Sequence, residues 1–153
     1  MHLMLYEKRY TMRKEHDFLG ELELADELYY GVQTLRGIEN FFITGKQIDL
    51  DFVKAMAMVK KACALANMST GRLDEKIGQA ISRAADEVVR GNFNDQFPVD
   101  PIQGGAGTSF NMNMNEVLAN RALEILGYEK GQYDIVSPNN HVNMAQSTND
   151  TFP

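Results

Sequence analysis

Two short segments of this chain combine glycine, hydroxyl and amide side chains in a pattern that suits the binding of a small anion. The first is GGAGTS at residues 104–109, directly ahead of a predicted helix. The N–H groups at a helix N-terminus and the helix dipole favour a negative charge there, and Thr108 and Ser109 add hydroxyl donors. The alternative is an ordinary helix start after a flexible loop. A phosphate-binding loop is disfavoured, because no lysine follows the glycines and no apolar strand precedes them.

The second segment is HVNMAQSTND at residues 141–150. Ser147 and Asp150 have the spacing of a capping box, which predicts a helix that begins there and carries hydroxyls and an amide in its first turn. His141 alone is more typical of a structural histidine than of a catalyst. The sequence contains no cysteine–histidine cluster and no pattern typical of a metal site. The two segments together therefore indicate neutral hydrogen-bond donation to a carboxylate.

Asparagines recur in the predicted helix that follows the first segment, at residues 111, 113, 115 and 120. Asparagine is a mediocre helix former, so its repeated use needs a reason. Asn111 and Asn115 are one turn apart and share a face. They lie either on a wet surface or in a buried polar network that positions the preceding loop. The spacing alone leaves both readings open.

Three amphipathic helices and one extended arm have to position these side chains. Helices are predicted over about 51–68, 74–91 and 111–126, from apolar residues at three- and four-residue steps. On the first helix the apolar positions are Phe52, Met56, Val59, Cys63 and Ala66, and on the third they are Met114, Leu118, Ala122 and Ile125. Residues 18–35 are strand-like and predict a short hairpin or extended arm. We expect a mainly α-helical domain with this arm at its N-terminus.

Composition excludes several classes of function. The chain has 153 residues, 44% of them hydrophobic, and a net charge of −6 without clustered basic residues, which argues against a nucleic-acid partner. No apolar run approaches the length of a membrane span. Cys63 is the single cysteine, so an internal disulfide is excluded and a cytoplasmic location is expected. Met12 is a more sensible start than Met1, so we interpret residues 1–11 as a leader or an extension.

Three stretches together resemble the aspartase/fumarase superfamily. GGAGTSFNMNMNEVLANRA (104–122) is similar to the first signature segment of that superfamily, and HVNMAQSTNDTFP (141–153) to the second. FLGELELADELYYGVQTLRGIENFFITG (18–45) resembles its N-terminal part. Two positions favour the aspartate ammonia-lyase family over class II fumarases. Ala106 stands where fumarases carry a serine near the substrate, and Ser137 where they carry a histidine of a secondary anion site.

The resemblance implies a reaction and a set of site residues. The reaction is the reversible conversion of L-aspartate to fumarate and ammonia through an aci-carboxylate intermediate. Thr108, Ser147 and Thr148 are implied to surround the substrate carboxylate, and Asn149 to hold the amino group. Supporting roles are expected for Ser109, Asn111, Asn115 and His141. No metal site and no required cofactor are implied, and activation by a divalent cation stays open.

The resemblance also implies an organisation. Residues 12–145 are expected to form an N-terminal lyase domain, and 146–153 the start of a central helical bundle that makes a homotetramer in the family. The family's third signature, with the serine that acts as general base, is not found in this sequence. We therefore expect no catalytic residue in this chain and no activity from it alone. The alternatives are the N-terminal domain of a class II fumarase and a stand-alone, non-catalytic binding or assembly domain.

Overall fold

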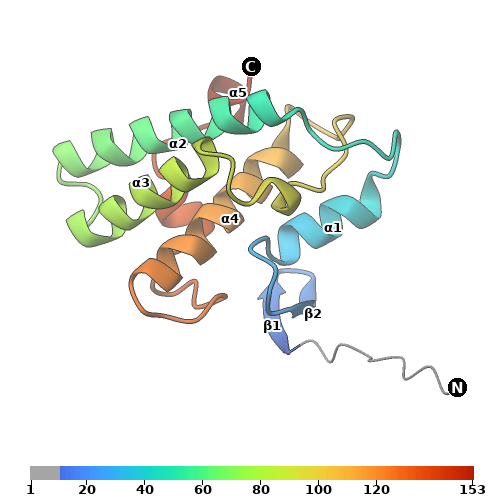
Figure 1. Ribbon diagram of the computed structural model, residues 1–153, viewed down its shortest axis with the longest axis horizontal. Helices are drawn as coiled ribbons and strands as arrows, with labels where there is room; N and C mark the ends of the chain where they lie inside the picture. The colour runs from blue at the N-terminus through green and yellow to red at the C-terminus, as the bar shows by residue number, and fades with distance from the viewer. Residues whose placement is uncertain (1–10) are drawn as a thin grey trace, which may run out of the picture.

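The computed structural model describes residues 11–153 and shows a helical domain with one small hairpin at its N-terminal end (Figure 1). The expected leader, residues 1–11, lies outside the described residues except for Thr11. Strands β1 (Met12–Asp17) and β2 (Gly20–Ala25) are antiparallel, and Met12 is opposite Ala25. Leu24 is buried while Glu23 beside it is exposed, the alternation from which the strand was predicted. The mainly helical fold with a hairpin arm is confirmed.

Helix α1 (Val32–Asn40) is the element that the sequence did not reveal. The extended arm was predicted to continue to Leu35, which is wrong over residues 32–35. The reason is a cap that comes from far along the chain, because Gly31, the residue before α1, has no side chain. The buried carboxylate of Glu116 accepts hydrogen bonds from the N–H groups of Gly31, Gln33 and Thr34, at 2.9–3.0 Å, and from the Thr34 hydroxyl at 2.6 Å.

Helices α2 (Leu50–Ser69) and α3 (Glu75–Val89) form an antiparallel pair and lie side by side in Figure 1. Both begin at caps that are local in sequence, and their bounds confirm the predicted helices to within about two residues. Asp49 accepts a hydrogen bond from the N–H of Asp51, and Asp74 accepts two from the N–H groups of Lys76 and Ile77. These caps satisfy donors that the first turn of a helix leaves unpaired.

The buried face of α2 differs in part from the predicted apolar stripe. Met56 is buried as expected, but Val59 and Cys63 are half-buried and Ala66 is exposed. The residues that α2 buries are Val53, Met56, Ala57, Lys60, Ala64 and Asn67. An apolar stripe misses this face because two of its members are polar.

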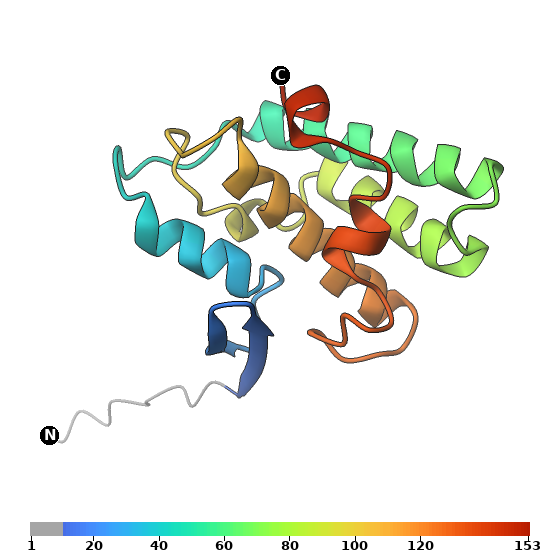
Figure 2. The same cartoon turned by 180° about the vertical axis from the view of Figure 1, so that it is seen from behind.

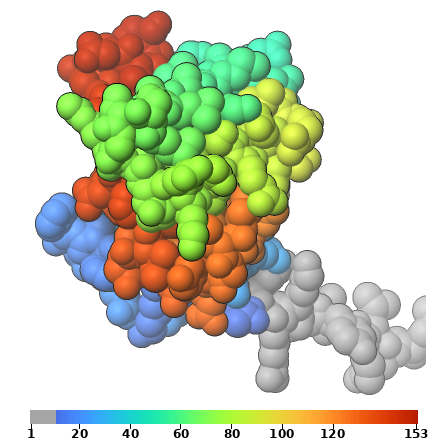
Figure 3. Space-filling view, turned by 90° about the vertical axis from the view of Figure 1, so that its left-hand side faces the viewer, coloured from blue at the N-terminus to red at the C-terminus, as the bar shows by residue number. Residues whose placement is uncertain are grey.

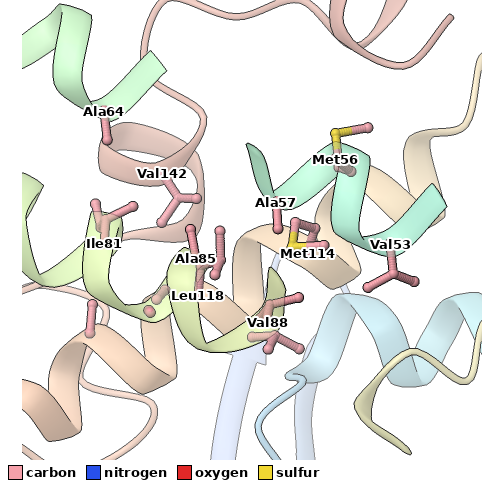
Figure 4. Close-up of a cluster of buried hydrophobic side chains, with 14 of the residues drawn as sticks. Val53, Met56, Ala57, Ala64, Ile81, Ala85, Val88, Met114, Leu118 and Val142 are labelled. Carbon is pink, nitrogen blue, oxygen red and sulfur yellow. The ribbon is translucent and has the colours of Figure 1, made fainter. Parts of the chain in front are cut away.

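Helix α4 (Thr108–Ile125) is enclosed by the rest of the domain and begins three residues before the predicted start. Helices α1, α2 and α3 and the segment Pro138–Val142 all contact it. Met114 and Leu118 meet residues of α2 and α3 in the central core, where Val53, Ile81 and Val88 also lie (Figure 4). Of the predicted stripe on α4, Met114, Leu118 and Ala122 are fully buried and Ile125 is half-buried.

The last segment of the chain runs across the back of α4 towards α2 (Figure 2). It contains the π-helix η2 (Pro138–Val142) and the single-turn helix α5 (Thr148–Thr151), whereas the 3₁₀-helix η1 (Asn94–Gln96) lies in the loop before α4. The chain ends at the surface beside α2 (Figure 3). Phe152 anchors this end, with its ring centroid 5.3 Å from Phe52 and 6.1 Å from Phe110.

A single carboxylate joins the loop after α1 to the loop before α4. Asp100 accepts hydrogen bonds from the N–H groups of Thr44 (2.6 Å), Gly45 (3.0 Å) and Ile102 (2.9 Å) and from the Thr44 hydroxyl (2.9 Å). Desolvation of Asp100 opposes ionisation, but these donors outweigh it and lower the pKa of the carboxyl group to about 2. The ionised form of Asp100 therefore holds the two loops together.

Within residues 11–153, no helix is both long enough and apolar enough to span a membrane.

Candidate functional site

The structure brings the two predicted segments together at the start of α4. The side-chain amide of Asn111, in the first turn of α4, donates to the hydroxyl oxygen of Thr148 at 3.2 Å. On the same side, Gly107 has a φ of +78° and lies against the ring of Phe152 so closely that a Cβ atom would overlap it. Glycine is required here for both reasons. Thr148 thus lies next to the helix turn that carries Thr108.

The hydroxyl groups at this place are not used to cap their helices. The residue before α4 is Gly107, so Thr108 belongs to the first turn, and its side chain is exposed. Ser147 precedes α5, but its side chain makes no capping bond, so the predicted capping box is wrong. Instead the carbonyl of Ser147 accepts from the N–H of Asp150. Asn149 is exposed like Thr108 and Ser147, so these side chains can reach a ligand.

A buried lysine, Lys60, connects the elements that form the site. Lys60 of α2 has an exposed fraction of 0%. Its Nζ atom donates to three side-chain amide oxygens: Asn111 at 2.6 Å, Asn143 at 2.9 Å and Gln146 at 2.8 Å. These partners come from α4 and from the segment that leads into α5. Sequence reasoning missed Lys60, because its spacing on α2 gives no sign that a lysine faces inwards.

Asn111 and Asn115 belong to the same buried network. Their exposed fractions are 2% and 0%, and both side-chain amides donate to the Oδ1 atom of Asn143, at 3.2 and 3.3 Å. Of the two readings that the spacing left open, the structure therefore shows the buried polar network. The other asparagines of α4 face elsewhere: Asn113 donates to the carbonyl of Gln96, and Asn120 to that of Tyr29.

Burial shifts the pKa values of two titratable groups near the site. Burial lowers the pKa of Lys60 to about 8, and the neighbouring Cys63 acts in the opposite direction. Burial also lowers the pKa of His141, whose Nδ1 atom accepts from the N–H of Ser137 at 2.9 Å. This bond ties the imidazole of His141 to the residue that precedes η2. The contacts of His141 therefore agree with a structural role, which was the more typical reading.

Thr108 and Ser109 also line a groove of about 400 Å³ to which α5 contributes no residue. It is bordered by α1, which contributes Gln33 and Arg36, and by the turn of the hairpin. The Arg36 guanidinium is held by Asp17 at 2.8 Å. Among residues 11–153, no group of three or more histidine, cysteine, aspartate or glutamate side chains is placed to hold a metal ion.

Solved structures show that this fold is the one found in fumarate lyases. The chain superimposes on a fumarate lyase:delta crystallin from Brucella melitensis with a TM-score of 0.91 and 49% identity, over 94% of this chain and 34% of that one. A class II fumarase from Schistosoma mansoni gives a TM-score of 0.87 and 39% identity, over 94% and 30%.

Sequence comparison defines the family. Residues 20–153 match the family described as Lyase, and the chain belongs to this lyase family. It is 63% identical over 141 residues to an aspartate ammonia-lyase of Bacillus subtilis and 53% identical over 146 residues to one of Escherichia coli. These matches cover 92% and 94% of this chain. The chain spans about 30% of the length of these curated relatives. The resemblance to aspartate ammonia-lyases is thereby confirmed.

Proposed function

We propose that this chain forms one side of the active site of an ammonia-lyase that reversibly converts L-aspartate to fumarate and ammonia. The observation that supports the proposal is the 3.2 Å contact between Asn111 and Thr148, which joins the start of α5 to the first turn of α4. Thr108, Ser147 and Thr148 bind the substrate carboxylate next to the carbon that loses its proton. Asn149 binds the amino group. The identity to relatives named aspartate ammonia-lyase supports this choice of substrate.

The chemistry assigned to these residues is stabilisation of negative charge. Removal of a proton from the carbon beside the carboxylate leaves an electron pair, which delocalises onto the two carboxylate oxygens as an aci-carboxylate. That pair then forms the carbon–carbon double bond of fumarate, while the carbon–nitrogen bond breaks and its electrons leave with the ammonia. Hydroxyl donors and the N–H groups at the start of α4 favour the doubly charged intermediate over the substrate. We assign no general base within this chain.

The second candidate is hydration of fumarate, because the fumarase from Schistosoma mansoni shares the fold. Ala106 argues against it by the resemblance described above, since it removes a hydroxyl that fumarases carry near the substrate. The two reactions share fumarate but differ in the other partner, ammonia or water. Substrate choice therefore separates them.

The test is a chimera in which residues 12–153 replace the matched part of the Bacillus subtilis aspartate ammonia-lyase. Fumarate formation, followed by ultraviolet absorbance, is expected from L-aspartate and not from L-malate. Formation from malate alone would favour the fumarase reading. A chimera that folds and assembles like its parent enzyme but produces fumarate from neither substrate would refute the proposal.

Ser147→Ala tests the assigned contact within that chimera. Because the Ser147 side chain makes no capping bond, its loss should leave the thermal midpoint unchanged. We expect kcat/KM for aspartate to fall by about a hundredfold, the usual effect of removing one donor to a developing oxyanion. Ser69→Ala, at the exposed end of α2, is the matched control and should retain full activity. Equal activity of the two variants would show that Ser147 does not bind the substrate carboxylate.

A further inference from the structure

Lys60 is a buried cation whose hydrogen-bond partners carry no charge. An ammonium group has three N–H bonds, and the Nζ atom of Lys60 has three amide oxygens within 2.9 Å. A neutral amine, with two N–H bonds, could donate to only two of these three oxygens. The geometry therefore fits the charged form. A buried charge without an opposite charge is costly, so its presence calls for a reason.

The contacts of Lys60 lead directly to the residues assigned to the substrate. Asn111, which accepts from Lys60 at 2.6 Å, also donates to the hydroxyl oxygen of Thr148. Gln146, which accepts from Lys60 at 2.8 Å, immediately precedes Ser147. Lys60 thus joins α2 to α4 and to the start of α5 through single amide side chains. Its charge is therefore separated from Ser147 and Thr148, which are assigned to the carboxylate, by one amide side chain each.

We propose that Lys60 is a positioning residue for a dicarboxylate: its buried ammonium holds Thr148 against α4 and supplies positive charge that a bound dianion offsets. The inference rests on the proposed function and deepens it. It makes the site selective for doubly charged ligands, because the attraction between Lys60 and a ligand grows in proportion to the ligand's charge. A purely structural lysine would affect ligands of either charge equally.

The test compares two competitive inhibitors in the Bacillus subtilis chimera, fumarate with two negative charges and monomethyl fumarate with one. Lys60→Met removes the charge and keeps an unbranched side chain that is one heavy atom shorter. We expect it to raise the inhibition constant of fumarate by about tenfold and that of monomethyl fumarate by about threefold, because the lost attraction scales with charge. Lys61→Met is the matched control, since Lys61 points away from the network and pairs with Asp86 at 2.7 Å. It should change neither constant by more than about twofold.

Asn143→Asp tests the same idea without removing the lysine. Its carboxylate would accept the bonds that Asn143 Oδ1 now accepts from Lys60, Asn111 and Asn115, and would lose one donated bond of 3.3 Å to the carbonyl of Gln146. Because it cancels the charge of Lys60 internally, we expect an equal or higher thermal midpoint together with about tenfold weaker fumarate binding. If charge in this network did not reach the ligand, Asn143→Asp would retain fumarate binding, because Asn143 is in direct contact with Lys60.

The outcomes separate the two proposals. If the unsubstituted chimera makes no fumarate from aspartate, the proposed function fails. If it is active but Lys60→Met weakens both inhibitors by the same factor, or Asn143→Asp binds fumarate as tightly as the parent, the role of Lys60 is overturned. Should Lys60→Met not fold, Asn143→Asp decides the question by the same comparison.

Discussion

Glu116→Gln should destabilise the domain through the start of α1, more than 80 residues away in sequence. One carboxylate oxygen of Glu116 accepts from the N–H of Gly31, the N–H of Thr34 and the hydroxyl of Thr34; the other accepts from the N–H of Gln33. Glutamine has one acceptor oxygen, which can serve the first group. Its NH₂ group must then face the N–H of Gln33, so this N–H loses its acceptor and the new NH₂ group lacks one.

The magnitude follows from these contacts. A buried donor without an acceptor costs about 1–3 kcal/mol, and the bonds that remain lose their charge assistance. Removal of a buried negative charge offsets part of this, because burial raises the pKa of Glu116 to about 7 and so disfavours its ionised form. We expect a net loss of about 2–4 kcal/mol in the free energy of unfolding.

The assay is urea denaturation of the 153-residue chain, followed by circular dichroism at neutral pH. Glu129→Gln is the control, since Glu129 is exposed in the loop after α4 and its substitution should cost less than about 0.5 kcal/mol. Hydrogen exchange adds a local readout, because the Gln33 amide should exchange faster in Glu116→Gln. Equal stability of the two variants would refute the interpretation of Glu116 as the cap of α1.

Two further predictions concern stability. Gly107→Ala should lower the free energy of unfolding by about 3 kcal/mol or more, because the added Cβ atom would overlap Phe152. Gly127→Ala, with a similar φ of +85° and open space around it, should lower it by about 1–2 kcal/mol from backbone strain alone. Equal losses in urea denaturation would contradict the packing of Phe152 against Gly107. The lowered pKa of Asp100 means that its contribution to stability is present above about pH 4 and is lost as the pH falls towards 2. The difference in unfolding midpoint between the chain and Asp100→Asn should therefore shrink over that interval. A constant difference would show that folding does not lower the pKa of Asp100.

The elements predicted correctly from sequence are those whose signals are local. Asp49 and Asp74 cap α2 and α3 within three residues of their own position, so the sequence shows where these helices begin. Helix α1 has no such signal, because Glu116 provides its cap from α4. From sequence alone, Gly31 and the alternating Leu22 and Leu24 are typical of an extended arm. The contact between Gly31 and the distant Glu116 is visible only in the fold.

The candidate site likewise contains residues that the sequence identifies and residues that it does not. Hydroxyl and amide side chains at residues 108–109 and 147–149 could be selected from sequence, because their types and their position before helices are visible there. Lys60 could not, since a lysine in an amphipathic helix is normally exposed and its partners lie 51 to 86 residues away. The capping box at Ser147 failed because the turn after it is closed by the backbone carbonyl of Ser147 and not by its hydroxyl.

Helix α4 is buried along most of its length. The residues buried along this helix are Phe110, Asn111, Asn113, Met114, Asn115, Glu116, Val117, Leu118, Ala119, Asn120, Ala122 and Leu123. A substitution at almost any of them meets a neighbour, whether or not it affects a ligand. A sequence pattern drawn from this stretch therefore detects a helix on which few positions tolerate substitution. A match to it identifies the architecture first, and the chemistry has to be established from the few exposed residues at either end.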